Sequence, residues 1–248
     1  MSRLLLASDF DGTLAAIREQ PEEVMMDPEA LQLLREASSN PDVAVALISG
    51  RDVDDLRRRA GDLRAWYSGS HGHEIVAPDG TKIRSATPWK GIPPREWLDR
   101  VTSAGFRVEP KRFGMALHWR GVEGIDHSHP IVRDFEQWAG SEGLAVIRGR
   151  CVSEASTGES SKEDVLRTLA ERTGAQQIIY AGDDLTDFAA LGFAASRGRG
   201  FLVASDERPE APPPGVETVA SREELLRSFA SVLEGLGVGF RGSGSSRP

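Results

Sequence analysis

Cysteine is almost absent from this 248-residue chain, in which Cys151 is the only one. A single cysteine cannot form an intramolecular disulfide, which excludes a disulfide-stapled scaffold and agrees with a reducing compartment. Long apolar runs are also missing, so no stretch is long enough to span a bilayer. The first residues lack the apolar segment and cleavage site of a secretory signal. We therefore expect a cytoplasmic protein without a membrane partner.

Positive charge is in short supply as well. The chain has 30 Lys and Arg against 38 Asp and Glu, a net charge of -8. Broad nucleic-acid binding draws its affinity from clustered basic side chains, so this balance argues against a nucleic-acid partner. The apolar fraction of 39% is typical of globular proteins. We expect a monomer that captures any anionic ligand at a local site.

Three short apolar runs predict buried strands, and each run ends in polar residues. The runs are Leu4–Ala7, Val43–Ile48 and 177–181, followed by Ser8–Leu14, Ser49-Gly50-Arg51 and Gly182–Asp187 respectively. Apolar residues at helical spacing predict helices over 28–37 and about 52–60 and 222–235, and a further helix that follows the capping-box spacing of 161–164 and stops at Gly174. Strands that alternate with helices indicate a parallel sheet with right-handed crossovers. The fold class is therefore α/β, with a Rossmann-like parallel-sheet core.

The pattern changes between about 86 and 153. Prolines flank Trp89 and Trp97 there, and short alternating runs such as Met115–Arg120 predict antiparallel strands. We interpret this stretch as an inserted α+β cap domain. The predicted organisation is a core domain over 1–86 and 154–235, a cap over 87–153, and a disordered Gly/Ser-rich tail over 236–248.

Acidic residues gather at one edge of the predicted sheet, because the carboxyl ends of parallel strands lie side by side. This edge would collect the carboxylates of Asp9, Asp11, Asp183, Asp184 and Asp187, the hydroxyl of Ser49 and the guanidinium of Arg51. Clustered carboxylates repel one another, and ligation by oxygen atoms alone suits Mg²⁺. A magnesium ion beside a carboxylate fits phosphoryl transfer, in which an aspartate can serve as the nucleophile.

The segment Asp9-Phe10-Asp11-Gly12-Thr13-Leu14 resembles the first motif of the haloacid-dehalogenase-like phosphatases. Ser49, Lys162 and Gly182-Asp183-Asp184 resemble the remaining three motifs, in the expected order and spacing. The resemblance implies that Asp9 is the nucleophile and Asp11 the general acid and base. It also implies Mg²⁺ bound by the Asp9 carboxylate, the Asp11 backbone carbonyl and Asp183, with Asp187 beside these ligands. Ser49, the Gly50 amide and Lys162 would then neutralise the phosphate.

Three further segments look like those of the trehalose-6-phosphate phosphatase family. They are Ser49-Gly50-Arg51, Gly69–Glu74, and Glu109-Pro110-Lys111 with His118-Trp119-Arg120. The family uses a Glu-x-Lys pair on its cap to hold sugar hydroxyls, which makes Glu109 and Lys111 candidate specificity residues. Arg51, His71, His118 and Arg120 are further candidates for substrate binding.

The chain departs from the family pattern at two places. Glu163 follows Lys162 where the family usually has Gly, and 154–158 lacks the usual Arg-Pro. The resemblance thus implies a magnesium-dependent phosphatase that hydrolyses trehalose-6-phosphate through an aspartyl-phosphate. Three alternatives stay open: a phosphatase for another glycosyl or disaccharide phosphate, a phosphosugar mutase, and a catalytically silent sugar-phosphate sensor.

Overall fold

The computed structural model describes residues 3–18, 23–61, 63–149, 151–158, 160–204 and 211–238. The chain divides into two compact units. The larger unit comprises Met1–Ile83, Lys162–Asp183 and Asp187–Pro248, and the smaller unit comprises Arg84–Ser161 and Asp184–Thr186. Within the described ranges, no helix is long and apolar enough to cross a membrane.

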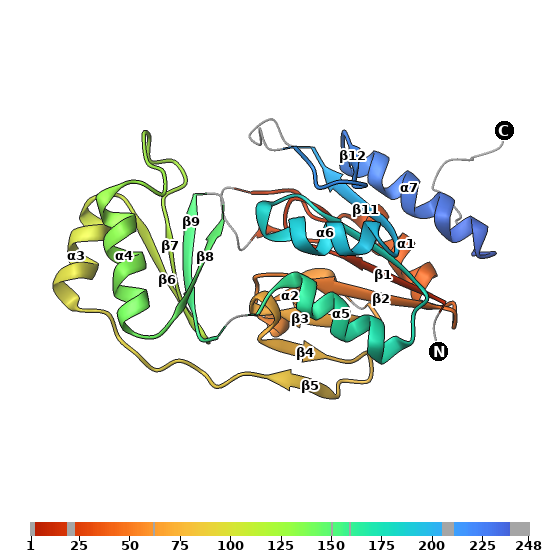
Figure 1. Ribbon diagram of the computed structural model, residues 1–248, viewed down its shortest axis with the longest axis horizontal. Coiled ribbons are helices and arrows are strands. Elements are labelled where there is room, and N and C mark those ends of the chain that lie inside the picture. The colour runs from red at the N-terminus through yellow and green to blue at the C-terminus, as the bar shows by residue number, and fades with distance from the viewer. Residues whose placement is uncertain are drawn as a thin grey trace. The chain divides into compact units, whose positions relative to one another are not determined.

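An eight-stranded sheet forms the centre of the larger unit (Figure 1). Its strands, in order across the sheet, are β12 (Glu217–Val219), β11 (Gly198–Val203), β10 (Gln177–Gly182), β1 (Leu4–Ser8), β2 (Val43–Ile48), β3 (Trp66–Gly69), β4 (Glu74–Val76) and β5 (Lys82–Ser85). The strands from β12 to β3 are parallel, and β4 pairs with β3 in the antiparallel direction. This parallel-rich sheet with helices confirms the predicted α/β class.

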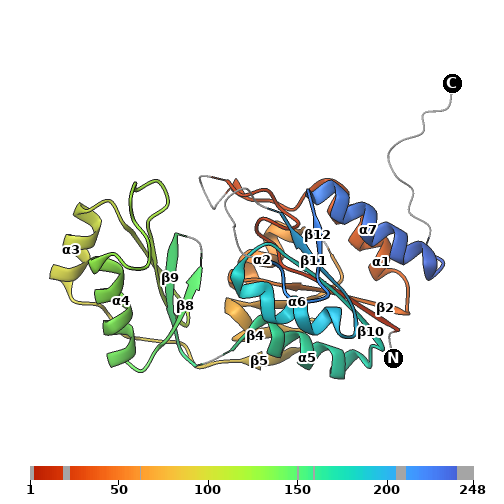
Figure 2. The same ribbon diagram turned by 45° about the horizontal axis from the view of Figure 1, so that its top comes forward.

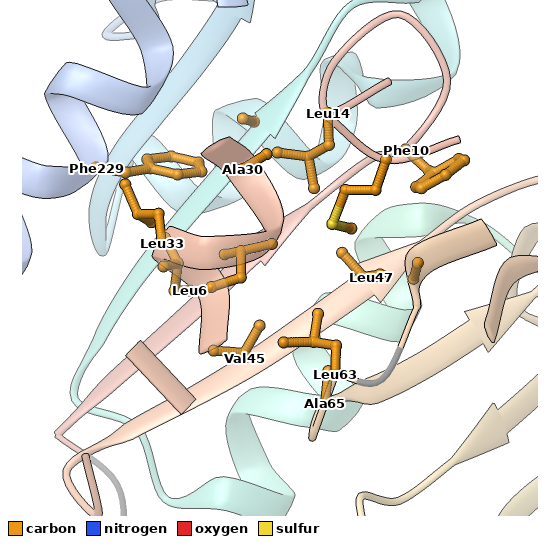
Figure 3. Close-up of a cluster of buried hydrophobic side chains, with 14 of the residues drawn as sticks. Leu6, Phe10, Leu14, Ala30, Leu33, Val45, Leu47, Leu63, Ala65 and Phe229 are labelled. Atoms are coloured by element: carbon orange, nitrogen blue, oxygen red, sulfur yellow. The ribbon is translucent and has the colours of Figure 1, made fainter. Parts of the chain in front are cut away.

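Helices cover both faces of this sheet (Figures 1 and 2). They are α1 (Pro28–Ser38), α2 (Val53–Ala60), α5 (Lys162–Thr173), α6 (Phe188–Ala195) and α7 (Arg222–Gly235). β1 shows the reason, because its side chains are buried on alternate sides. Leu6 packs in one cluster with Leu33 of α1 and Phe229 of α7 (Figure 3), whereas Leu5 packs with side chains of α5 and α6. The sheet is therefore buried between two layers of helices.

The smaller unit is a four-stranded antiparallel sheet with two helices. Its strands run in the order β6 (Arg107–Lys111), β7 (Gly114–His118), β9 (Val152–Ser156) and β8 (Ala145–Gly149), and its helices are α3 (Arg95–Ser103) and α4 (Pro130–Ser141). Met115 and Leu117 pack with Phe135 of α4 in the apolar core of this unit. Side chains at alternate positions leave the other face polar: Glu109 pairs with Ala116, which pairs with Glu154.

Element boundaries agree with the sequence predictions in most places. The strand predicted over Val43–Ile48 has those bounds, and helices near 28–37, 52–60 and 222–235 are confirmed. The smaller unit comprises Arg84–Ser161 and Asp184–Thr186, which is a wider range than the cap over 87–153 that the sequence predicts. The reason is β9, whose last residues pair with β7 rather than joining the larger sheet. Of the tail expected from 236, residues 239–248 lie outside the described residues.

Candidate active site

Three neighbouring parallel strands bring the predicted motifs to one edge of the larger sheet. β10, β1 and β2 are adjacent, and Ser8 at the end of β1 is in register with Ala181 of β10 and Leu47 of β2. The backbone N–H of Asp9 donates to the carbonyl oxygen of Ala181 over 2.8 Å, so the sheet ladder fixes the start of the following loop. The loops after all three strands therefore meet at this edge, as expected for parallel strands.

Asp9 is a buried carboxylate held by a buried ammonium. Lys162, the first residue of α5, donates from Nζ to Oδ1 of Asp9 over 2.6 Å and to Oδ1 of Asp187 over 2.8 Å. Burial raises the pKa of Asp9 well above its ordinary value of 3.8; Lys162 opposes this rise, and Asp187 and Asp183 add to it. Burial alone would lower the pKa of Lys162, but the carboxylates of Asp187 and Asp9 outweigh it and hold that pKa above its ordinary value.

Asp9, Asp183 and Asp187 form a buried cluster that could hold a metal ion. Each offers a carboxylate oxygen, and the three oxygens lie within 4.8 Å of one another. Lys162 supplies one positive charge against these three carboxylates, so the negative charge in excess fits a divalent cation. Asp187, expected beside the ligands rather than among them, offers an oxygen to the same cluster.

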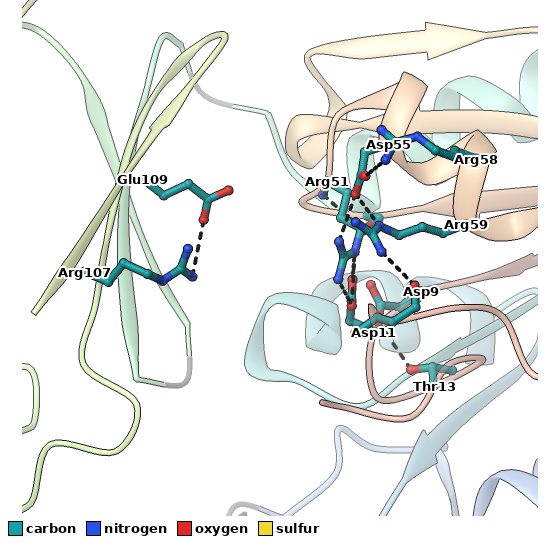
Figure 4. Close-up of polar contacts among 11 residues, drawn as sticks. Asp9, Asp11, Thr13, Arg51, Asp55, Arg58, Arg59, Arg107 and Glu109 are labelled. Atoms are coloured by element: carbon teal, nitrogen blue, oxygen red, sulfur yellow. Dashed lines mark hydrogen bonds and ion pairs between the residues drawn. The ribbon is translucent and has the colours of Figure 1, made fainter. Parts of the chain in front are cut away.

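Gly12 and Thr13 pack directly against this cluster. Gly12 has a φ of 82°, and a Cβ atom there would lie 2.3 Å from Oδ2 of Asp183, so only glycine lets the loop pass this close. The hydroxyl of Thr13 lies 3.4 Å from Oδ2 of Asp9 (Figure 4), and it lies 3.4 Å from Oδ1 of Asp183. The loop after β1 therefore lies against the carboxylate that follows β10.

Tyr180 is a member of this site that the sequence analysis missed. It is fully buried in β10, and its hydroxyl donates to Oδ1 of Asp187 over 2.5 Å. Burial raises the pKa of Tyr180 well above its ordinary value, and the charge of Asp187 adds to this rise. The sequence feature that could have indicated Tyr180 is a tyrosine inside an apolar strand, because a buried phenol hydroxyl needs a hydrogen-bond partner.

The predicted phosphate loop, Ser49-Gly50-Arg51, is fixed by the turn after β3. The N–H of His71 donates to the Ser49 carbonyl oxygen over 3.1 Å, and the N–H of Ser70 donates to the Arg51 carbonyl oxygen over 2.7 Å. Ser70 and His71 both have a positive φ, at 51° and 53°, which is uncommon for residues other than glycine. The ring of His71 packs against Gly50, where a Cβ atom would lie 2.5 Å from Nε2. The structure therefore brings together Ser49, Gly50 and His71.

Arg51, predicted as a substrate ligand, grips Asp11 with one edge of its guanidinium. Nε donates to Oδ2 of Asp11 over 2.8 Å, and Nη2 donates to Oδ1 over 2.7 Å (Figure 4). The Asp11 side chain is 36% exposed, whereas that of Asp9 is 7% exposed. Two aspartates that are two residues apart thus have different cationic partners: Lys162 for Asp9 and Arg51 for Asp11.

The smaller unit carries its own set of charged side chains on the polar face of its sheet. Nε2 of His118 lies 2.7 Å from Oε2 of Glu109, and Lys111 donates to Oε2 of Glu154 over 2.6 Å. The hydrogen bond from His118 lowers the pKa of Glu109 against the opposing effect of burial, and Lys111 lowers it further. Glu154 was not among the predicted site residues. It pairs with Ala116, which pairs with Glu109, so the strand register places Glu154 on the same face as Glu109.

Of the binding residues predicted in the smaller unit, Arg120 joins neither of these pairs. It lies exposed in the turn that follows β7. Arg107, at the start of β6, approaches Glu109 instead, with 3.8 Å between Nη2 and Oε2 (Figure 4). The polar face of the smaller sheet therefore carries two hydrogen-bonded pairs, each of a carboxylate with a nitrogen donor, and such groups can donate to and accept from hydroxyl groups.

The chain is similar to known proteins in both sequence and fold. The chain is 33% identical over 246 residues to a trehalose-phosphate phosphatase of Mycobacterium marinum, covering 92% of this chain and 62% of that protein. It is 36% identical over 215 residues to an uncharacterized glycosyl hydrolase of Mycobacterium tuberculosis, covering 80% of this chain and 16% of that protein. The chain thus spans less than two thirds of the length of these relatives.

Among solved structures, the fold is similar to the C-terminal domain of a trehalose-6-phosphate phosphatase from C. albicans. The TM-score is 0.72 at 17% sequence identity, and the match covers 94% of this chain and 92% of that one. The sequence model of the trehalose-phosphatase family matches residues 7–200, which include every predicted site residue of both units. The chain therefore belongs to the trehalose-phosphatase family.

Proposed function

We propose that this chain is a phosphatase that hydrolyses trehalose-6-phosphate to trehalose and inorganic phosphate through an aspartyl-phosphate on Asp9. The observation that carries the proposal is the buried arrangement of Asp9, Lys162 and Asp187 beside Asp183 at the carboxyl edge of the sheet. A buried cluster of three carboxylates is costly for stability, so a fold that keeps one has a use for it. Family membership supports the same activity.

The chemistry divides into two steps. In the first, a carboxylate oxygen of Asp9 attacks phosphorus, the bond from phosphorus to the sugar oxygen breaks, and Asp11 gives its proton to the departing oxygen. In the second, a water molecule gives a proton to Asp11 and attacks phosphorus, which breaks the bond to Asp9 and releases phosphate. The ammonium of Lys162 holds Asp9 in position and offsets negative charge in both steps.

Mg²⁺ is the cation that we propose for the carboxylate cluster. Asp9, Asp183 and Asp187 would hold it, because hard oxygen ligands of this kind suit Mg²⁺. When bound, the ion would offset the charge of the phosphate oxygens. Ser49 and the Gly50 amide lie in the loop after the neighbouring strand and would bind those oxygens as hydrogen-bond donors.

Sugar recognition is proposed for the polar face of the smaller sheet. Glu109 and His118 form one pair there, and Lys111 and Glu154 form another. Each pair presents a carboxylate beside a nitrogen donor, which can bind a sugar hydroxyl as both donor and acceptor. Arg120, Arg51 and His71 remain candidates for further contacts with the substrate.

Phosphate release from a panel of sugar phosphates tests the substrate. The panel contains trehalose-6-phosphate, other glycosyl and disaccharide phosphates, and an aryl phosphate, each assayed with Mg²⁺ and with a chelator. The Asp9→Asn variant is the blank. Magnesium-dependent preference for trehalose-6-phosphate supports the proposal, and preference for another sugar phosphate would change the substrate but not the reaction. Tight binding without phosphate release would favour the sensor, and transfer of the phosphoryl group within the sugar would favour the mutase.

The covalent intermediate can be tested separately from the substrate. Acid quench during turnover, followed by borohydride reduction, converts a phosphorylated aspartate into homoserine. Mass spectrometry of the peptide that contains position 9 then reads the conversion. With p-nitrophenyl phosphate, whose leaving group departs without a proton, we expect homoserine at position 9 in the Asp11→Asn variant, because this variant lacks the base for the second step. Homoserine at no position during active turnover would refute the covalent mechanism.

A further inference from the structure

Both edges of the Arg51 guanidinium are occupied by carboxylates. The Nε and Nη2 edge grips Asp11, and Nη1 donates to Oδ2 of Asp55 in the first turn of α2 over 2.9 Å. The side chains of Arg51 and Asp55 are 15% and 16% exposed, so solvent screens these ion pairs only in part. A planar guanidinium held at both edges has one orientation, and this orientation fixes the plane of the Asp11 carboxylate.

Asp55 is itself anchored to the core of the larger unit. Its Oδ2 atom accepts a second hydrogen bond, from Nε of Arg59 over 2.6 Å. Arg59 is buried, and it is fixed by two contacts with the segment before α1: its Nη1 donates to the carbonyl oxygen of Val24, and its own carbonyl oxygen accepts from the N–H of Met26. A chain of alternating charges therefore runs from the buried side of α2 to Asp11 (Figure 4).

The contact with Arg51 leaves room on the Asp11 carboxylate for further hydrogen bonds. An ionised carboxylate has about four acceptor sites, and the guanidinium edge approaches from one side only. Acceptor sites therefore remain on both oxygens of Asp11 for the proton that moves in catalysis. What the grip removes is rotation of the carboxylate, which matters because proton transfer requires the donor and acceptor within hydrogen-bonding distance.

We propose that Asp55 is a positioning residue, which acts through Arg51 to hold the Asp11 carboxyl group in the orientation required for proton transfer to the leaving group. The inference rests on the proposed function, because it takes Asp11 as the general acid. In this role Asp55 contributes to catalysis without touching the substrate. Arg51, in turn, acts on Asp11 in addition to any contact it makes with substrate.

Two substrates with different leaving groups can distinguish this positioning role from a merely structural one. A sugar alkoxide needs a proton as it departs, whereas a nitrophenolate departs without one. The Asp55→Ala variant should therefore lose kcat/KM for trehalose-6-phosphate by about tenfold more than for p-nitrophenyl phosphate, a part of the full contribution of a general acid. Asp55→Asn keeps an acceptor oxygen for Arg51 and should recover part of this selective loss. The wild-type enzyme is assayed in parallel on both substrates.

Arg58→Gln is the matched control. Arg58 pairs with the other oxygen of Asp55, over 3.1 Å, but its side chain is 69% exposed and lies outside the chain of contacts that reaches Asp11. This variant removes an ion pair from the same carboxylate and should leave the ratio of the two kcat/KM values unchanged. Arg51→Lys provides a second test should Asp55→Ala fail to fold, because lysine keeps the charge but cannot grip Asp11 with two donors.

Asp11→Asn provides the decisive background. If Asp55 acts through Asp11, adding Asp55→Ala to Asp11→Asn should change the residual kcat/KM by less than twofold, because coupled residues are not additive. An equal loss on both substrates, or a further tenfold loss in the Asp11→Asn background, would overturn the inference while leaving the proposed function intact. Failure of the wild-type enzyme to release phosphate from any substrate would instead refute the proposed function, and the inference with it.

Discussion

Replacing Asp183 by asparagine should stabilise the protein in a chelator and destabilise it, relative to wild type, in Mg²⁺. The reason lies in the buried cluster, where oxygens of Asp9, Asp183 and Asp187 lie within 4.8 Å of one another. Lys162 donates to Asp9 and Asp187, so one cation serves these two carboxylates. Asparagine keeps the size of Asp183 and an acceptor oxygen for Thr13, and removes only the charge.

The magnitude follows from the distance. Two unit charges 4.8 Å apart repel by about 3.5 kcal/mol at an effective dielectric constant of about 20. The raised pKa of Asp9 means that protonation relieves part of its repulsion, and Lys162 offsets part of the charge of Asp187. We therefore expect a net gain of about 2 kcal/mol in the free energy of unfolding, which corresponds to a rise in Tm of about 4–8 °C for a protein of this size.

Thermal unfolding tests both expectations, because Tm is measured once with a chelator and once with Mg²⁺. A ligand at 100 times its Kd stabilises the folded state by about 2.7 kcal/mol, so wild-type Tm should rise on adding Mg²⁺, and the Asp183→Asn variant should lose most of that rise. The control is Asp184→Asn, because the Asp184 carboxylate accepts from the N–H of Leu185 and is not part of the cluster. A variant that is less stable than wild type in chelator, and that keeps the full Mg²⁺ shift, would refute the assignment of the cluster as a metal site.

Three further predictions follow from single contacts. Gly12→Ala should lower the free energy of unfolding by about 1–2 kcal/mol from its positive φ alone. It should also displace Asp183 and abolish the Mg²⁺-dependent shift, whereas Gly80→Ala, with a φ of 87° and no atom within 4 Å of a Cβ, should show the strain without that loss. For Asp55, burial would raise the pKa, but hydrogen bonds from Arg59 and Arg51 lower it below its ordinary value of 3.8. The stabilising effect of the Asp55 ion pairs is therefore present above pH 3.8 and lost as the pH falls further. In urea titrations, the difference in the free energy of unfolding between wild type and Asp55→Ala should become smaller below that pH. Glu109→Ala should lower kcat/KM for trehalose-6-phosphate by about tenfold or more while hydrolysis of an aryl phosphate survives; equal losses on both would contradict a role in sugar recognition.

Short-range physics explains which parts of the fold could be predicted from the sequence. Val43–Ile48 is a continuous run of apolar residues, and a strand buried on both faces needs such a run. Asp27 and Pro28 mark the start of α1, because the Asp27 side chain accepts from the N–H of Glu29 and proline suits the first turn. The end of the smaller unit was harder to predict: Glu154–Ser156 pairs with β8, which is near in sequence, and with β7, which is distant.

In the candidate site, too, local features could be predicted from the sequence and long-range contacts could not. The carboxyl ends of parallel strands converge by topology, so the sequence was enough to expect Asp9 near Asp183, and the structure brings them together. The partner of a long side chain is a different matter, because Arg51 could reach several acceptors and its choice of Asp11 depends on Asp55 and on the loop tied to Ser70. Tyr180 and Glu154 were missed because their roles depend on tertiary contacts. Tyr180 donates to the buried carboxylate of Asp187, and Glu154 accepts from Lys111, which is distant in sequence. The roles of all these residues stay predictions.

Asp9 and Asp11 illustrate how one short loop can supply two chemically different carboxylates. Asp9 is buried against a compact ammonium that contacts its Oδ1 atom over 2.6 Å. Among the described residues, the hydrogen bond to its Oδ2 atom is a long one, 3.4 Å from the Thr13 hydroxyl, so this oxygen is the less firmly held of the two. Asp11 is more exposed, and both of its oxygens accept from a guanidinium that is itself fixed by Asp55. A nucleophile requires a dry site and a weakly engaged oxygen, whereas a proton carrier requires a fixed orientation and contact with water. Different surroundings for paired carboxylates are how enzymes assign such roles, and Asp9 and Asp11 differ both in burial and in their cationic partners.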